Sequence, residues 1–356
     1  MTSPREAGYR MPAEWAPHAA TWVAWPSHPD LWKENLPAVR GAFTSLVQAI
    51  VAGEVAEVLV PDAENERLAR AALGAIAWDR VRFHRVPFGD IWLRDTAPVY
   101  VASSSASSDR RLATVRFVFN GWGGKYVLDH DERVAERVAA ISGEPAFARP
   151  FVLEGGAVEV DGEGSVLTTR QCLLNPNRNP TLSEVQIEEA VLESLGGEKL
   201  LWVGDGLLND HTDGHVDTIA RFVHPGVVVA MEPRSADDPN REVLATLIRD
   251  LESLTDAKGR RLEVVRVPSP GRVLDDAREI MPASYVNFYI ANASVVVPTY
   301  GSPFDDEAVQ RIAALFPGRT TRGVNAKAVL AGGGAFHCIT QQKPQAGHAP
   351  QDGSQD

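Results

Sequence analysis

Gly332-Gly-Gly-Ala-Phe-His-Cys-Ile-Thr340 is the stretch around which this chain is organised, because it contains Cys338, one of only two cysteines. Glycine lets a backbone bend sharply or approach a ligand closely. A thiol placed just after three glycines can therefore be presented to a small molecule. A thiolate is a strong nucleophile only where its pKa is lowered or a base takes its proton. Nucleophilic chemistry at Cys338 thus requires a base, an orienting acid and a substrate clamp elsewhere in the chain.

The composition is that of an ordinary globular protein. The chain has 356 residues, of which 44% are hydrophobic and 23% charged, and its formal net charge is −12. An acidic surface argues against a nucleic-acid partner and is consistent with a cationic one. Two cysteines are too few for a disulfide scaffold. The N-terminus has no apolar core like a secretion signal, and no apolar run is long enough to cross a bilayer, so we predict a cytoplasmic protein without a membrane partner.

Helical and extended patterns alternate along the chain. Residues 35–51 place apolar side chains along one helical face, whereas residues 55–61 are typical of a strand. Thr181 and Glu184 have the spacing of a capping box and predict a helix that runs to about Leu195. This alternation predicts an α/β fold.

Three segments are expected to lack regular structure. Residues 1–10 are interpreted as a loose arm, and residues 11–26, rich in Trp and Pro, as an irregular wall of the core. Residues 345–356 are polar and rich in turn formers, so we predict a disordered tail.

Residue types that can take part in catalysis occur in loops near positions 90, 154, 210 and 332, spread over the whole chain. A doubly wound sheet gathers its site at the carboxyl ends of its strands. A pseudo-symmetric ring of small ββαβ-like modules would instead gather such loops at its centre. The sequence has no clear repeat, so the ring is a preference between two architectures.

His215 and Asp217 are two residues apart, so on a strand they point to the same face. A histidine can shuttle protons near neutral pH, and a carboxylate beside it can orient it or bind a cation. An exposed polar loop would explain the same pattern. So would a metal site, because oxygen and imidazole ligands are crowded into thirteen residues: Asp205, Asp210, His211, Asp213, His215 and Asp217.

Three other residues have ordinary explanations when each is taken alone. Asp95 is typical of an ion-paired or surface carboxylate. Glu154 follows an apolar segment, where a carboxylate needs a partner, and a structural hydrogen bond would supply one. Cys172 is flanked by apolar residues and is expected to be a buried, inert thiol.

Taken together, the candidate residues indicate a cysteine hydrolase with surplus acid. An amide substrate calls for hydrogen-bond donors around its oxygen, yet this set contains three carboxylates. Three carboxylates suit a substrate that is itself a cation with several N–H donors, such as a guanidinium. The set consists of Cys338, His215, Asp95, Asp217 and Glu154.

The chain resembles the agmatine deiminases of the guanidino-group-modifying (pentein) superfamily, in the peptidyl-arginine deiminase-like family. The resemblance covers nearly all of the chain, from Met11 to about Pro344. It is carried by Met11-Pro-Ala-Glu-Trp15…Trp25-Pro26, Asp90-Ile-Trp-Leu-Arg-Asp-Thr96, Phe119-Asn-Gly-Trp-Gly-Gly124, Glu154-Gly-Gly156, Cys172-Leu-Leu-Asn-Pro-Asn-Arg-Asn179, Asp213-Gly-His-Val-Asp217, Ser284-Tyr-Val-Asn-Phe-Tyr-Ile-Ala-Asn292 and Gly332-Gly-Gly…His337-Cys-Ile-Thr-Gln-Gln342.

The resemblance implies a five-bladed α/β propeller and a single catalytic deiminase domain over residues 1–344. It implies no metal and no organic cofactor, which makes the metal interpretation a minor alternative, and it suggests a homo-oligomer. By the same resemblance, Cys338 is the nucleophile, His215 the acid and base, and Asp95 and Asp217 the grip on the guanidinium. Glu154 supports the site beside His215.

The reaction expected from the resemblance is hydrolysis of agmatine to N-carbamoylputrescine and ammonia through a covalent thiouronium on Cys338. Protonated His215 would favour the thiolate and would then act as acid and as base. Trp92 and Trp122 are candidates for contacting the amine end of agmatine. Peptidyl-arginine and free arginine stay open as substrates. A non-catalytic binder of guanidino or polyamine ligands and a metal-dependent hydrolase that uses residues 205–217 stay open as functions.

Four positions depart from the pattern of the family that the chain resembles. None of them removes a catalytic residue, but they leave the exact guanidino substrate open. They are Ala97, His211, Ala335 and Phe336.

Overall fold

The structure is a computed structural model that describes residues 2–103 and 111–346. The tail predicted for residues 345–356 lies almost entirely outside the described residues. Among the residues that the structure describes, no helix is both long and apolar enough to cross a membrane.

Strands and helices alternate along the described chain, which confirms the α/β class. The strands are β1 (Tyr9–Arg10), β2 (His18–Ala24), β3 (Val55–Val60), β4 (Val81–Arg85), β5 (Val99–Ser103), β6 (Leu112–Val118), β7 (Ala146–Val152), β8 (Val158–Val160), β9 (Ser165–Thr169), β10 (Lys199–Val203), β11 (Ala220–His224), β12 (Val227–Glu232), β13 (Glu263–Pro268), β14 (Tyr289–Ile290), β15 (Ser294–Thr299), β16 (Thr320–Asn325) and β17 (Thr340–Pro344). The α-helices are α1 (Pro29–Trp32), α2 (Leu36–Ile50), α3 (Ala63–Leu73), α4 (Leu93–Thr96), α5 (Gly121–Gly124), α6 (Val134–Ser142), α7 (Arg170–Leu173), α8 (Glu184–Leu195), α9 (Arg241–Ser253), α10 (Asp305–Leu315) and α11 (Lys327–Leu330). The 3₁₀ turns are η1 (Lys33–Asn35), η2 (Trp78–Arg80), η3 (Asp131–Arg133), η4 (Gly155–Ala157) and η5 (Val216–Thr218).

Within the described residues the strands form five separate sheets. Their strand orders are β17-β2-β3-β4, β1-β5-β6-β7, β10-β9-β8, β11-β12-β13 and β14-β15-β16. Each sheet contains an antiparallel pair followed by a parallel pair. In one of them β8 pairs antiparallel with β9, and β9 pairs parallel with β10 across α8. A module with the order ββαβ is therefore repeated around the molecule, although no repeat is visible in the sequence.

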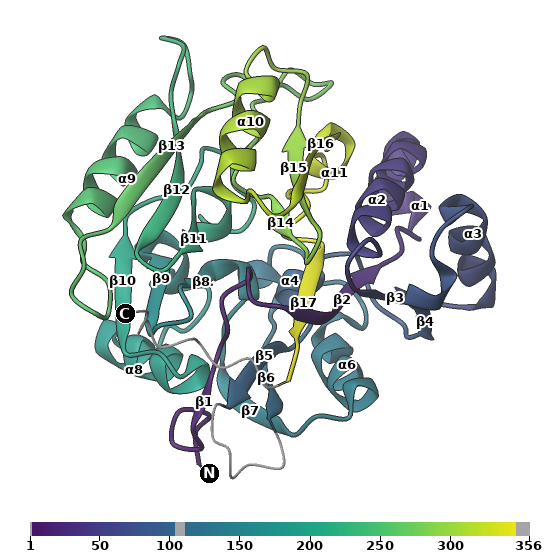
Figure 1. Cartoon of the computed structure of the whole chain (residues 1–356), viewed down its shortest axis with the longest axis horizontal. Coiled ribbons are helices and arrows are strands. Elements are labelled where there is room, and N and C mark those ends of the chain that lie inside the picture. The colour runs from purple at the N-terminus through teal and green to yellow at the C-terminus, as the bar shows by residue number, and fades with distance from the viewer. Residues whose placement is uncertain (1, 104–110, 347–356) are drawn as a thin grey trace.

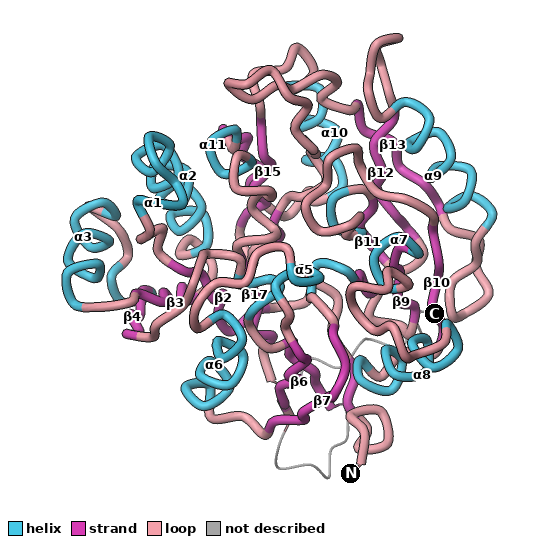
Figure 2. Tube along the Cα trace, turned by 180° about the vertical axis from the view of Figure 1, so that it is seen from behind, coloured by secondary structure: helices cyan, strands magenta, loops and turns pink. Residues whose placement is uncertain are grey.

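The two ends of the described chain meet in one sheet. Strand β17 pairs antiparallel with β2, so that Thr340 lies opposite Val23. Figure 1 shows this contact as a yellow strand beside a purple one, with the longer helices around the outside of the molecule. Seen from behind, loops and the short helix α5 lie over the middle (Figure 2). Cys338 lies two residues before β17, so the pairing of β17 with β2 helps to position the cysteine.

Two helices show how local sequence sets these elements. Helix α2 spans Leu36–Ile50 and buries Val39, Phe43 and Leu46 on one face, as its apolar spacing predicts. The predicted helix before Leu195 is also present, but the prediction of its cap was wrong. The capping box is formed by Ser183 and Gln186, because the Ser183 side chain accepts from the Gln186 amide and Gln186 bonds back to the Ser183 amide.

The expectation for residues 1–10 and 11–26 was wrong as well. Tyr9–Arg10 form β1, which pairs antiparallel with β5. His18–Ala24 form β2, an interior strand between β17 and β3. The prolines that suggested irregular structure lie outside this strand, with Pro17 directly before it and Pro26 two residues after it, so neither removes a hydrogen bond from it.

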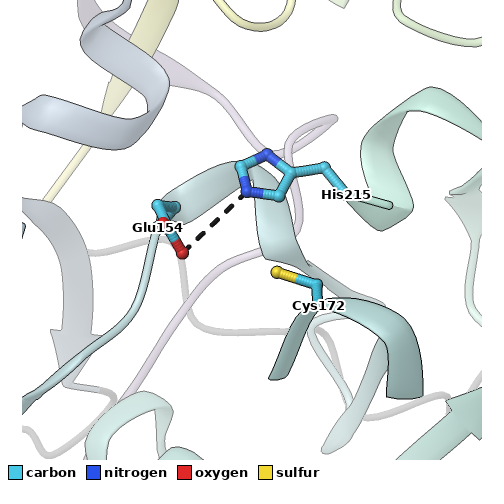
Figure 3. A group of neighbouring side chains, drawn as sticks. All are labelled: Glu154, Cys172 and His215. Carbon is cyan, nitrogen blue, oxygen red and sulfur yellow. Dashed lines mark ion pairs between the residues drawn. The ribbon is translucent and has the colours of Figure 1, made fainter. Parts of the chain in front are cut away.

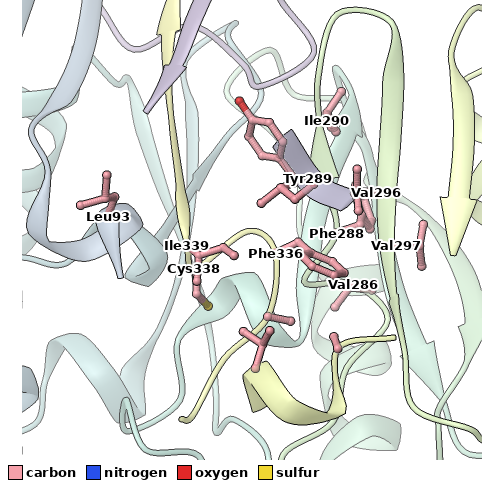
Figure 4. Packing of buried hydrophobic residues seen from close by; sticks show 14 of the residues in the cluster. Leu93, Val286, Phe288, Tyr289, Ile290, Val296, Val297, Phe336, Cys338 and Ile339 are labelled. Carbon is pink, nitrogen blue, oxygen red and sulfur yellow. The ribbon is translucent and has the colours of Figure 1, made fainter. Parts of the chain in front are cut away.

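A large apolar core lies behind the loop that carries Cys338. Phe288, Val296, Phe336 and Ile339 are fully or almost fully buried in it. Figure 4 shows Cys338 and Ile339 between Leu93 and the group that contains Phe288 and Val296. The apolar neighbours fix the backbone on both sides of the cysteine, so the thiol is held by packing and not by the glycines alone.

Candidate active site

The five candidate residues come from four segments that are distant in sequence. Asp95 lies in α4, Glu154 directly before η4, His215 and Asp217 at η5, and Cys338 before β17. All five are buried, with exposed fractions of 7% for Asp95, 4% for Cys338 and 0% for the other three.

The thiol of Cys338 lies between an amide and a carboxylate. Asn287 Nδ2 donates to Sγ at 3.1 Å, and the Cys338 amide donates to Asn287 Oδ1 at 3.4 Å. Sγ lies 3.6 Å from Asp217 Oδ2. A Cβ on Gly334 would lie 2.9 Å from Sγ, so the glycine loop does approach the thiol closely. The sequence analysis did not assign Asn287 a role, although its segment was part of the family resemblance.

The two aspartates differ in how many of their oxygens are hydrogen-bonded. Asp95 Oδ2 accepts from Trp122 Nε1 at 2.9 Å, and Asp95 Oδ1 accepts from the Gly156 amide at 2.9 Å. Asp217 Oδ2 accepts from His337 Nδ1 at 2.6 Å. Asp217 Oδ1 is buried and has no hydrogen-bond partner in the described part of the chain.

Gly156 marks the point on which these groups converge. A Cβ added there would lie 2.6 Å from His215 Nδ1, 3.0 Å from Asp95 Oδ1 and 3.1 Å from Asp217 Oδ2. Any larger residue would occupy the space that the three side chains face. The second glycine of Glu154-Gly-Gly156 is therefore needed for close approach.

His215 lies between two carboxylates without a hydrogen bond to either. Its Nδ1 is 3.8 Å from Asp95 Oδ1, and its Nε2 is 3.9 Å from Glu154 Oε2. Neither ring nitrogen has a hydrogen-bond partner among the described residues, and neither has Glu154 Oε2. The other oxygen of Glu154 accepts from Arg178 Nε at 2.9 Å. A buried imidazole with two free nitrogens can take up or deliver a proton.

In the substrate-free site, the surroundings of His215 and Cys338 favour the neutral forms of both side chains. Burial, together with Arg178 and Lys125, holds the pKa of His215 well below its usual value. Burial raises the pKa of the Cys338 thiol well above its usual value, and Asp217 and Asp95 raise it further. Both groups are therefore neutral at rest, because neither is exposed to water that would stabilise its charged form.

The ionised forms of the Asp95 and Asp217 carboxyl groups are also unfavourable when no cation is bound. Burial raises the pKa of Asp95 to about 7, with a contribution from Glu154. Burial and Asp95 raise the pKa of Asp217 well above its usual range. A bound cation with N–H donors would satisfy both groups.

Both candidate tryptophans lie beside these residues. Trp122 is 6% exposed and donates to Asp95. Trp122 lies in the short helical turn Gly121–Gly124, and its φ of 52° is unusual for a bulky residue. Trp92 donates from Nε1 to Asp90 Oδ2 at 2.8 Å. Its ring lies so close to the glycine loop that a Cβ on Gly334 would be 2.8 Å from it.

The metal-site alternative over residues 205–217 gains no support from the geometry. Asp210 accepts from the amide and hydroxyl of Thr212, and Asp213 pairs with Arg178 and Lys125. Within the described ranges, the residues whose atoms lie close enough to hold a metal form a different group of three. They are Glu154, Cys172 and His215 (Figure 3).

A network of buried ion pairs surrounds Glu14, although Arg221 Nη2 has no hydrogen-bond partner among the described residues. Glu14 Oε2 lies 3.1 Å from Arg94 Nη2, 3.0 Å from Arg221 Nη2 and 2.8 Å from His337 Nε2. Burial alone would raise the pKa of Glu14, but Arg221, His337 and Arg94 together hold it well below its usual value. Sequence reasoning missed this role of Glu14. The signal was available, since a carboxylate in the apolar Met11-Pro-Ala-Glu-Trp15 segment needs a partner.

The four departures lie in different surroundings. Ala97, Ala335 and Phe336 are buried in the hydrophobic core. His211 stacks on Tyr126, with ring centroids 5.7 Å apart, and a Cβ on Gly333 would lie 2.9 Å from its Nδ1. Of the four positions, His211 is therefore the one that lies between the glycine loop, at Gly333, and Tyr126.

Comparison with known proteins gives consistent matches along nearly the whole chain. A family model described as Porphyromonas-type peptidyl-arginine deiminase matches residues 10–344. The agmatine deiminases of Stutzerimonas stutzeri (strain A1501) and Ectopseudomonas mendocina (strain ymp) are each 39% identical to the chain, over 96% of it and 97% of the relative. A solved structure of the agmatine deiminase of Enterococcus faecalis matches with a TM-score of 0.90 and 34% identity, over 97% of this chain and 98% of that one.

Proposed function

The chain belongs to the Porphyromonas-type peptidyl-arginine deiminase family, and from this membership we propose that it hydrolyses agmatine to N-carbamoylputrescine and ammonia. The enzyme is then a hydrolase that acts on a C–N bond of a linear amidine. Relatives named as agmatine deiminases match it over their full length.

The observation that carries the proposal is the convergence of Asp95, Asp217 and His215 around Gly156, with the Cys338 thiol 3.6 Å from Asp217. A guanidinium bound there would donate N–H bonds to the two aspartates and present its carbon to the thiol. Agmatine brings the positive charge that the two carboxyl groups lack. Free arginine would add an α-carboxylate, whereas Arg178 and Lys125, the cations that act on His215, are already paired with Glu154 and Asp213. Peptidyl-arginine would need an open cleft, whereas every candidate residue here is buried.

The first half of the reaction forms a bond between sulfur and carbon and breaks a bond between carbon and nitrogen. Substrate charge beside Cys338 lowers the pKa of its thiol, and neutral His215 takes up the proton. The thiolate attacks the guanidino carbon. His215 then gives the proton to a terminal nitrogen, which leaves as ammonia, and a thiouronium remains on Cys338.

The second half reverses the roles. His215, neutral again, takes a proton from water, and the resulting hydroxide attacks the same carbon. The bond to sulfur breaks, the added hydroxyl loses its proton to solvent as the carbonyl of N-carbamoylputrescine forms, and the thiolate recovers its proton from His215. The overall reaction therefore releases one proton, which converts ammonia to ammonium. Glu154, fixed by Arg178, lies 3.9 Å from His215 Nε2 and stabilises its protonated form. In this scheme Trp122 orients Asp95, and Trp92 and Trp122 border the substrate.

The test is ammonia release from agmatine, free arginine and a peptide with an internal arginine, each with and without a chelator. We expect release from agmatine alone, unchanged by the chelator, and none from a Cys338→Ser variant that melts at the same temperature as the parent. Substantial turnover by that variant would overturn the nucleophile assignment. Binding of agmatine without ammonia release by the parent would favour the non-catalytic binder, and loss of activity with the chelator would favour a metal-dependent hydrolase.

We also propose that the five sheets are the blades of a five-bladed α/β propeller and that residues 1–344 form one catalytic domain. The repeated ββαβ order and the pairing of β17 with β2 support both statements. A single cooperative unfolding transition in calorimetry would support one domain, whereas two separated transitions would contradict it.

A further inference from the structure

We propose that Glu154, Cys172 and His215 form a binding site for a thiophilic divalent cation of the zinc type, and that an ion bound there inhibits the enzyme by occupying His215. The inhibition, but not the binding, rests on the proposed function. Cys172 has no part in the proposed reaction.

The geometry brings three different ligand types together in the interior. One ligand atom from each side chain lies within 4.8 Å of the other two. His215 Nε2 and Glu154 Oε2 are 3.9 Å apart, and both are buried atoms without a hydrogen-bond partner in the described chain. Figure 3 shows the carboxylate of Glu154 and the sulfur of Cys172 on the same side of the His215 ring. Two unpartnered atoms beside a thiol are what a bound ion would satisfy.

The elements that carry these side chains hold them firmly. Cys172 lies in α7, whose first turn is capped because the Thr169 hydroxyl accepts from the Cys172 amide at 3.2 Å. Arg178 fixes Glu154 through its other oxygen. The Thr212 hydroxyl accepts from the His215 amide at 3.0 Å. A small movement of side chains, and not of backbone, would suffice to bring three ligands onto one ion.

The ligand chemistry selects the type of ion. Thiolate, imidazole and carboxylate are together the ligands of zinc, in sites where a fourth position is left to water. Calcium and magnesium prefer six or more oxygen ligands, and this group offers a single carboxylate oxygen. The thiolate and the carboxylate together carry two negative charges, of which that of Glu154 is shared with Arg178.

Binding requires the thiol to lose its proton. Burial and Glu154 raise the pKa of Cys172 well above its usual value, so the free thiol is protonated. An ion therefore displaces a proton when it binds, and its affinity rises with pH. His215 and Cys172 are both fully buried, so the proposal requires the ion to enter by the route by which substrate reaches His215.

The first experiment measures binding without any need for turnover. Cobalt(II), the probe for a zinc-type site, is titrated into a Cys338→Ala variant, in which Cys172 is the only thiol left. We expect one cobalt ion per chain and a near-ultraviolet thiolate-to-cobalt absorption band. Added zinc should displace the cobalt and abolish the band. The Cys172→Ser/Cys338→Ala double variant is the matched control and should show no band. A Cys338→Ala protein that shows no band overturns the proposal, whether or not the parent is a deiminase.

The second experiment measures inhibition. Ammonia release by the parent and by Cys172→Ser is followed against free zinc, each relative to its own zinc-free rate. Loss of a ligand should raise the half-inhibiting zinc concentration at least about tenfold, since even outer-shell changes reach that size. Equal inhibition of the two proteins would place the inhibitory ion elsewhere and overturn that part of the proposal. A Cys172→Ser protein that melts early is replaced by Cys172→Ala, and the same comparison is made.

Discussion

Two groups of buried polar side chains meet at the contact between His337 and Asp217, and they differ in how they are paired. In the first group, Glu14 is surrounded by Arg94, Arg221 and His337 at 2.8–3.1 Å. At the candidate site, neither nitrogen of His215 has a hydrogen-bond partner in the described residues. Both groups are fully buried, so burial alone does not distinguish them.

This difference in pairing distinguishes a group that stabilises the fold from a group that is available for catalysis. A buried charge with its partners in place holds segments together, and removing one partner leaves the others unpaired. A buried polar atom without a partner costs free energy that a ligand or a proton can recover. The paired group therefore supports the frame in which the unpaired group remains available to a substrate. The predictions below test this division, from the largest expected effect to the smallest.

His215→Gln should separate activity from stability most sharply. The variant removes the proposed acid and base, so kcat for ammonia release should fall about 10²- to 10⁴-fold. The melting temperature should stay close to that of the parent, because the ring nitrogens have no hydrogen bond to lose. Steady-state kinetics and thermal unfolding on the same preparation measure both. A variant with full kcat would remove His215 from the reaction.

Glu14→Gln should have the opposite effect, with a large loss of stability. Neutralising the carboxylate leaves Arg94 and Arg221 without their shared partner and should lower the free energy of unfolding by about 3–5 kcal/mol. Chemical denaturation measures the loss. Glu64→Gln is the matched control, because Glu64 pairs with Arg67 on the exposed surface of α3 and its loss should be negligible. Equal stability of the two variants would contradict a supporting role for the paired group.

Gly156→Ala tests whether the unpaired group depends on empty space. The new methyl would lie 2.6 Å from His215 Nδ1 and 3.0 Å from Asp95 Oδ1, so these groups must shift. A misplacement of this kind should lower kcat/KM on the order of 10²-fold. Gly41→Ala in α2 is the control, since nothing lies within 4 Å of its added Cβ. If Gly156→Ala and Gly41→Ala are equally active, the side chains do not converge on a bound substrate.

The pH dependence of kcat/KM tests the charge of the unpaired group. The pKa of Asp95 is raised to about 7, so this carboxyl group is protonated and uncharged below that pH. Agmatine keeps its guanidinium charge throughout, and kcat/KM should therefore fall as the pH drops below about 7, by up to about tenfold per pH unit. Initial rates at low agmatine concentration measure the profile. A flat profile between about pH 5 and 7 would show that Asp95 carries no charge that the substrate needs.

Local pattern made several elements of this fold predictable. The apolar spacing of residues 35–51 gave α2, and the alternation of patterns gave the α/β class. Prediction from local pattern was wrong at residues 11–26, because the prolines on both sides of β2 suggested irregular structure. The repeat of ββαβ modules was not visible in the sequence because each module is held by its own apolar neighbours and needs no shared residues.

The residues of the site were named from the sequence, since Cys338, His215, Asp95, Asp217 and Glu154 lie in motifs shared with a known family. The resemblance also implied that they form one site, and the structure brings them together. Their state was not available from the sequence. Charge and pairing depend on what surrounds an atom in space, and no spacing along the chain reports that.

The sequence by itself thus determined the class of fold, the reactive residue types and the family. Only the tertiary structure decided that Glu14 is paired while His215 is not, that His215 and Cys338 are neutral at rest, and that Cys172 lies beside His215. The physical reason is that secondary structure follows from contacts between near neighbours in the chain. Burial, pairing and pKa follow from contacts between segments such as α7, η5 and β17, which meet only when the sheets assemble.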